Sequence, residues 1–348
     1  MNDRLRNITR SQLFWPCVTL TLMCMVNFYF NRGFFDIEIK DGHLYGSVID
    51  ILNRAAPMLL IAMGMTLVIA TRGIDISVGA TVAIAGAVVA SMIGGSLVIQ
   101  DGVQTYVSNV PMPVAIICAL VVALICGLWN GLLVAGAGMQ PIVATLILMV
   151  AGRGVAQLIT EGQIVTVYYE PFFFIGNGFL LGIPFSLYVV AVVLIALLFM
   201  VHRTALGLFI EAVGVNPVAA RFSGISARAL IFWVYAFCSL TAGIAALIVT
   251  SNIKSADANN AGLMLELDAI LAVALGGTSL AGGRFNLIGT LLGGLIIQTL
   301  TYAIYSLGVP PEINMVVKAI VVFAVCLIQS SALRALLAKH MFRTGVVA

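Results

Sequence analysis

Long apolar runs, separated by short polar stretches, occupy most of this chain. Hydrophobic residues make up 61% of the 348 residues and charged residues 9%, whereas a soluble domain carries about 25% charged residues. A helix that crosses a bilayer needs about 20 apolar residues, because only backbone that satisfies its own hydrogen bonds is stable in lipid. The sequence therefore predicts an all-α integral membrane protein.

We expect ten transmembrane helices in a single transmembrane domain over residues 1–348. The predicted spans are 13–30, 50–71, 77–97, 112–134, 142–160, 184–201, 228–250, 264–281, 285–305 and 312–330. A cleavable signal peptide would end in small residues, but the first run ends in Phe28-Tyr29-Phe30-Asn31-Arg32. We therefore expect this run to remain as the first helix.

The charges between the spans indicate an orientation, because Lys and Arg favour cytoplasmic segments. With the N-terminus inside, most cations fall on the cytoplasmic side and the opposite side carries mainly acids. An even number of spans then makes both tails, 1–12 and 331–348, cytoplasmic. Spans two to five run opposite to spans seven to ten, which permits an inverted repeat around a central pathway.

The sequence lacks the residues that several classes of function require. The net charge of +3 is scattered along the chain, which excludes a basic nucleic-acid surface. No Gly-Lys pair exists, so no phosphate-binding loop of the ATPase type is present. We also find no HExxH, GxSxG or CxxC pattern, and we predict no catalytic residue, metal or cofactor.

Glycines recur in small-xxx-small spacing, as in Gly127–Gly131, Gly289–Gly293 and Gly79–Ala83. Such spacing lets helix backbones approach closely in lipid. We favour tight packing within one bundle over a specific dimer seam.

A polar island at 202–227 separates two apolar runs. Thr204 or the turn at Gly207 can begin a helix through Glu211, Pro217 interrupts it, and Ser223-Gly224 ends the segment. A loop of this length with its own helical pattern is uncommon unless it is functional. We interpret it as a cytoplasmic docking element for another protein, with a plain solvated loop as the alternative.

A second polar break lies at 71–80. Asp75 or Ser77 can cap the helix that follows, and Arg72 and Asp75 can neutralise each other. The break is either a tight turn at the membrane surface or an interrupted helix that dips into the bundle and lines a cavity.

The third polar group precedes and opens the eighth span. Acidic Glu266 and Asp268 suit the positive end of a helix dipole. Alternatively, Asp257, Asn259, Asn260 and Glu266 form the rim of an outward-facing mouth for a neutral polyhydroxylated solute or a docking protein.

Three motifs resemble those of ribose-type ABC importer permeases. The island reads Glu211-Ala212-x-Gly214-x-Asn216-x-x-Ala219-Ala220-x-x-Ser223-Gly224-Ile225, residues 73–80 read GIDISVGA, and residues 276–289 read GGTSLAGGRFNLIG. The stretches 41–57, 140–160, 256–273 and 310–319 are similar to the galactofuranose permeases of enterobacteria. One departure is Thr71-Arg72-Gly73, where the family usually has a Gly-Gly pair.

The resemblance implies a type II ABC importer permease in the bacterial inner membrane. Its partners would be a cytoplasmic ATPase, a second and different permease chain, a periplasmic sugar-binding protein and membrane lipid. The island would be the coupling helix that sits in a groove of the ATPase. Its implied contact residues are Glu211, Ala212, Gly214, Asn216, Ala219, Ala220 and Gly224. The candidate pathway residues are Arg72, Asp75, Ser77, Asp257, Asn259, Asn260 and Glu266.

The main alternative is a secondary transporter that is driven by an ion gradient. Such a protein needs a buried titratable relay, and the acids of this chain lie near span ends. A membrane enzyme is the third class, and it lacks any catalytic constellation.

Overall fold

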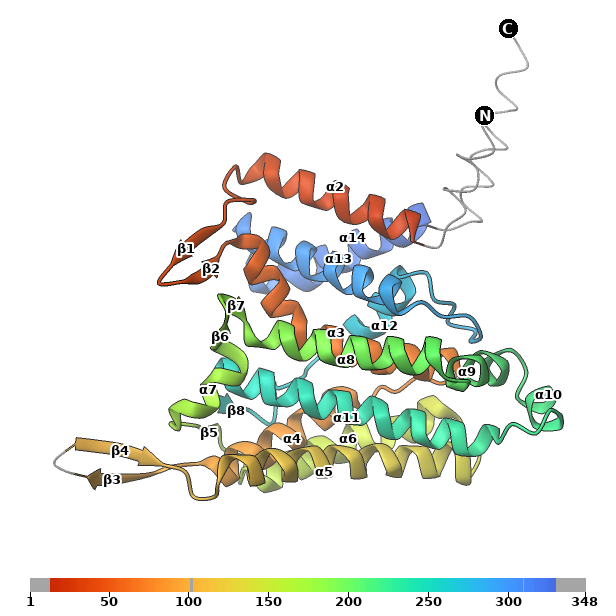
Figure 1. Ribbon diagram of the computed structural model, residues 1–348, viewed down its shortest axis with the longest axis horizontal. Helices are drawn as coiled ribbons and strands as arrows, with labels where there is room; N and C mark the ends of the chain where they lie inside the picture. The colour runs from red at the N-terminus through yellow and green to blue at the C-terminus, as the bar shows by residue number, and fades with distance from the viewer. Residues whose placement is uncertain (1–12, 101–102, 309, 330–348) are drawn as a thin grey trace, which may run out of the picture.

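The computed structural model describes residues 13–100, 103–308 and 310–329. Within these residues the protein is a bundle of roughly parallel helices, with short β-hairpins at one end and helices α9 and α10 at the other (Figure 1). A helix overlaps each of the ten predicted spans. These helices are α2 (Phe14–Phe30), α3 (Ser47–Ala70), α4 (Val78–Ile93), α5 (Met112–Gly131), α6 (Pro141–Ile159), α8 (Phe185–Arg203), α11 (Ala227–Ile253), α12 (Leu265–Leu275), α13 (Leu287–Ser306) and α14 (Pro311–Gln329).

Three further helices lie between these, together with one π-helical turn and eight short strands. The helices are α7 (Glu170–Asn177), α9 (Leu206–Val215) and α10 (Pro217–Phe222), and the π turn η1 (Leu132–Gly136) continues α5. The antiparallel strand pairs are β1 (Glu38–Lys40) with β2 (His43–Tyr45), β3 (Ser96–Gln100) with β4 (Val103–Val107), β5 (Val165–Thr166) with β8 (Ser255–Ala256), and β6 (Phe179–Leu180) with β7 (Ile183–Pro184). The all-α prediction missed these short strand pairs.

Helices α3 and α11 form the centre of the bundle. Every residue of α3 from Ala55 to Ala70 is buried, and α11 packs against α3, α4 and α5. The outer helices α2, α5, α6 and α8 instead expose many large apolar side chains. That distribution suits a multi-pass membrane protein whose outer surface faces lipid and whose polar breaks are covered by protein.

The lengths of the helices differ from the prediction at one span. Six helices of the described part are long and apolar enough to cross a membrane, namely α3, α5 with η1, α6, α8, α11 and α13. Helix α12 has only 11 residues, which gives a length of about 16 Å, half of a bilayer core of about 30 Å. The span predicted at 264–281 is therefore too long, and the count of ten crossings stays a prediction.

Glycines allow helices to approach closely, as the small-residue spacing predicts. A Cβ built on Gly127 of α5 would touch the Tyr235 carbonyl and the Ala236 Cα of α11. On α13, a Cβ at Gly293 would clash with the Ala272 carbonyl of α12. The interpretation as packing within one bundle is confirmed at these two sites.

The pair Gly127→Val and Gly154→Val tests this packing. Gly127 faces the backbone of α11, whereas a Cβ at Gly154 of α6 has no atom within 4 Å. Overpacking a tight contact costs about 1–3 kcal/mol, so Gly127→Val is expected to lower the melting temperature in detergent. Gly154→Val serves as the control and should melt like the wild type; equal melting of both variants would contradict the packing role of Gly127.

Candidate functional site

The polar island forms two helices rather than one interrupted helix. The Thr204 Oγ1 accepts a hydrogen bond from the Leu206 N–H at 3.2 Å, where α9 begins. Asn216 ends α9 and caps α10, because its Oδ1 accepts from the N–H groups of Val218 (3.0 Å) and Ala219 (3.1 Å). Pro217 therefore opens a helix, at the first position, where its missing N–H costs nothing. The predicted end at Ser223-Gly224 is correct.

The seven residues implied for ATPase contact divide by exposure. Asn216, Ala219 and Gly224 are exposed, Glu211 and Ala212 are half-buried, and Gly214 and Ala220 are buried. The most prominent side chains of α10 are two that the sequence analysis missed, Val218 and Phe222, which are 63% and 89% exposed. Their spacing of four residues, which places them on one helix face, was a readable signal.

Gly214 fixes α9 to two other segments of the bundle. A Cβ at Gly214 would clash with the Ala70 carbonyl and with the backbone of Gly283. The Gly283 N–H in turn donates to the Ala70 carbonyl at 2.9 Å. The C-terminus of α9, the end of α3 and the loop after α12 therefore meet at one point.

Arg72 belongs to this junction. Its Nη2 donates to the carbonyl of Val215, the last residue of α9, at 2.5 Å. Its backbone has φ +66°, a left-handed conformation that is uncommon for residues other than glycine, asparagine or aspartate. The expected pairing with Asp75 is wrong, since the ion pairs of the described residues are Lys40–Glu38 and Lys318–Asp268.

Asp75 is instead fully buried in a small polar cluster beneath the junction. Its Oδ1 accepts from the Ser77 N–H (3.0 Å) and from the Ser77 hydroxyl (2.6 Å). The amide of Asn130 on α5 donates to the Ser77 Oγ at 2.7 Å and to Asp75 at 3.4 Å. The break at 71–80 is therefore a turn that enters the bundle and is covered by protein, and Asn130 is a partner that the sequence analysis missed.

The loop before α12 is held by its own side chains and by α6. The Asp257 Oδ1 accepts from the backbone N–H groups of Asn259 (2.9 Å) and Asn260 (3.2 Å), and its Oδ2 accepts from the Asn260 amide at 2.7 Å. The hydrogen bond from the Asn260 side chain is the main cause that lowers the pKa of Asp257. Arg153 of α6 donates to three carbonyls of this loop, among them Ala261 at 2.5 Å.

Glu266 does not share the surface of that loop. Its side chain is buried, and its carboxylate lies where a Cβ on Gly79 would be. The first turns of α4 and α12 therefore meet inside the bundle, with a carboxylate near both positive helix ends. The structure places Asp257, Asn259 and Asn260 together, and Glu266 apart from them.

A cavity of about 760 Å³ lies on the other side of α12. It opens among the ends of α3, α11, α12 and α13 that lie toward the β-hairpins (Figure 1). Arg54, Asp268 and Gln298 are among its lining residues. The sequence analysis missed this cavity, although a polar stripe in the ninth span was a readable signal.

Metal chemistry has no candidate within the described residues. There, no group of three or more His, Cys, Asp or Glu side chains is placed to hold a metal ion.

Comparison with known proteins identifies the family. Residues 47–326 match the family described as branched-chain amino acid transport system / permease component. The galactofuranose transporter permease protein YtfT of Escherichia coli K12 is 50% identical over 91% of this chain and 90% of its own length. The fructose import permease protein FruF of Bifidobacterium longum is 37% identical (94% and 90%), and the ribose import permease protein RbsC of Escherichia coli K12 is 38% identical (82% and 85%).

No solved structure matches the chain. These relatives are transport permeases and not enzymes, so they support the interpretation as a transport subunit over the enzyme alternative. The chain therefore belongs to the family of membrane transport permeases described as branched-chain amino acid transport system / permease component.

Proposed function

We propose that the protein is the permease subunit of an ABC importer and forms the membrane pathway for a monosaccharide, galactofuranose or a related pentose or hexose. Relatives that cover most of the chain at 37–50% identity are named as permeases for galactofuranose, fructose and ribose. None of these names supports the ion-coupled alternative.

The observation that carries this proposal is the exposed apolar face of α10. Val218 and Phe222 project from a short, capped helix at one end of the bundle. Exposed apolar side chains of this size are typical of a protein contact. We propose that the residues 202–227 are the cytoplasmic coupling loop, and that the ATPase contacts α10 directly while Gly214 and Ala220 position it from below.

The remaining partners and the location follow from the same proposal. A second, different permease chain completes the pathway, and a periplasmic sugar-binding protein delivers the solute. The protein lies in the bacterial inner membrane with both termini in the cytoplasm. The tails 1–12 and 331–348 lie outside the described residues.

The candidate pathway residues take different parts in this proposal. Arg72 transmits movement of α9 to the turn at 71–77, which Asp75 and Ser77 hold in shape. Asp257, Asn259 and Asn260 form the rim of the outward mouth. Glu266 holds the start of α12 against α4, so the polar backbone at the start of this half-length helix stays covered by protein.

The variant Phe222→Asp tests the docking face. A carboxylate in place of the exposed ring should prevent burial against the ATPase, because a charge is costly to bury without a partner. We expect co-purification with the ATPase and ATP-driven sugar uptake to fall at least tenfold. Leu181→Asp is the control for ATPase binding, since Leu181 is 90% exposed in the β6–β7 turn at the other end. Normal ATPase binding by Phe222→Asp would contradict the docking assignment.

Two substitutions of Arg72 separate the effect of its side-chain hydrogen bond from the effect of its strained backbone. Arg72→Ala removes the bond to Val215 and keeps the left-handed strain, whereas Arg72→Gly removes both. A residue forced into such a conformation costs about 1–3 kcal/mol, so the alanine variant should melt at a lower temperature than the glycine variant. Both variants should still bind the ATPase. Both should import sugar more slowly than the wild type. Wild-type uptake by both would show that Arg72 transmits nothing.

A further inference from the structure

One side of α12 faces the cavity of about 760 Å³ described above. On the neighbouring helices α13 and α3, the polar lining residues lie along one face of each helix. On α13 the lining residues are Gln298, Thr301, Tyr302, Tyr305 and Ser306, at positions i, i+3, i+4, i+7 and i+8. Such positions form one face of a helix. These five polar residues of a largely apolar helix therefore lie on the face that looks into the cavity.

The opposite wall repeats the pattern with charged residues. Asp50 and Arg54 are one turn apart on α3, and both line the cavity. Arg54 lies well inside a membrane-length helix, and it makes no hydrogen bond or ion pair with another described side chain. A cation within such a helix usually faces a water-filled space and marks a solute or ion path.

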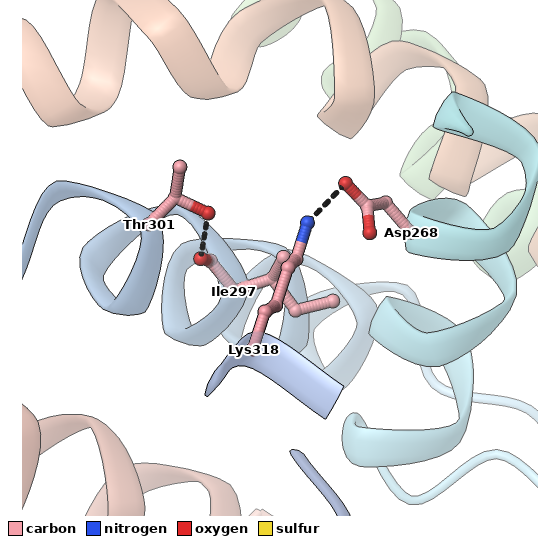
Figure 2. A network of polar contacts seen from close by, with 4 residues as sticks. All are labelled: Asp268, Ile297, Thr301 and Lys318. Atoms are coloured by element: carbon pink, nitrogen blue, oxygen red, sulfur yellow. Dashed lines mark hydrogen bonds and ion pairs between the residues drawn. The ribbon is translucent and has the colours of Figure 1, made fainter. Parts of the chain in front are cut away.

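An ion pair closes the third side. The Lys318 Nζ of α14 lies 2.6 Å from the Asp268 Oδ2 of α12, and both side chains are only about 20% exposed. Figure 2 shows this pair beside Thr301, whose own hydroxyl donates to the Ile297 carbonyl within α13. Lys318 is not itself a lining residue, but it pairs with the lining residue Asp268. The other two charged lining residues, Asp50 and Arg54, have opposite signs, so the charges in and beside the cavity balance.

We propose that this cavity binds the transported solute before it crosses, and that it accepts a neutral, hydroxyl-rich molecule of monosaccharide size. This inference rests on the proposed function. The volume falls within the range of about 300–1,000 Å³ that is usual for small-molecule sites. Arg54 and the carboxylates of Asp50 and Asp268 can hold adjacent hydroxyls, and the rings of Tyr302 and Tyr305 can cover the apolar face of a sugar ring. The balanced charge disfavours an anionic solute.

The first test is uptake by the complete transporter, with its ATPase and binding protein, in proteoliposomes supplied with radiolabelled D-galactose, D-ribose or D-fructose. Arg54→Gln leaves the packing intact, because the side chain is exposed, and should raise the apparent KM at least fivefold. Gln298→Trp should fill the cavity and lower uptake at least tenfold. Ile320→Trp, on an exposed position of α14, is the control and should transport like the wild type.

The readouts separate the cavity from the proposed function. Sugar uptake by the wild-type complex tests the function, and the ratio of variant to wild type tests the cavity. Wild-type kinetics in both Arg54→Gln and Gln298→Trp would overturn the cavity and leave the function standing. Co-purification of the ATPase shows that each variant has assembled; if Gln298→Trp does not assemble, Arg54→Gln decides.

A binding measurement on the permease–ATPase complex tests the class of solute. Saturation-transfer NMR with the three sugars should give a signal that weakens in Arg54→Gln, while L-leucine should give none. A leucine signal that depends on Arg54, without a sugar signal, would overturn the assignment in favour of a zwitterionic solute.

Discussion

Polar backbone inside a lipid-embedded bundle needs a partner, and this requirement determines where the helices of the protein are interrupted. Helices α4 and α12 both begin inside the bundle, so the segments before them must be covered. Asp75 and Asn130 cover the first segment with hydrogen bonds to Ser77. Arg153 covers the second with bonds to three carbonyls. Because an unpaired amide or carbonyl costs several kcal/mol in lipid, these side chains allow α4 and α12 to begin inside the bundle.

The end of α3 and the loop after α12 also fix the position of the proposed docking element. The Ala70 carbonyl, at the end of α3, accepts from the Gly283 N–H and lies against Gly214 of α9. A helix that continued past residue 70 would leave no free carbonyl and no room for this contact. The island is therefore more than an exposed loop, since backbone contacts that only glycine permits at 214 hold it to the end of α3 and to the loop after α12.

Hydropathy alone was sufficient to locate ten helices, because a long apolar run in lipid has no other stable conformation. Hydropathy did not give the length of α12. Residues 276–281 are small and apolar enough to extend the apolar run, although their glycines end the helix. The pairing of Arg72 with Asp75 was wrong because their proximity in sequence says nothing about depth, and one lies at the surface while the other is buried. Asn130 and Arg153 form hydrogen bonds with other segments, so single-sequence periodicity gave no signal for their partners.

Helix α12 connects the two ends of the molecule. Asp268, near its start, lines the cavity and holds Lys318 of α14, and the loop after its end reaches the α9 junction through Gly283. A segment of only 11 residues bends little. Under the proposed docking of the ATPase on α10, a displacement of α9 would therefore reach the cavity as a movement of the whole helix. Small shifts are amplified in this way when packed elements have two discrete arrangements. Gly276 and Gly293 lie against the backbone of the neighbouring helix, so α12 and α13 approach closely and the position of one constrains that of the other.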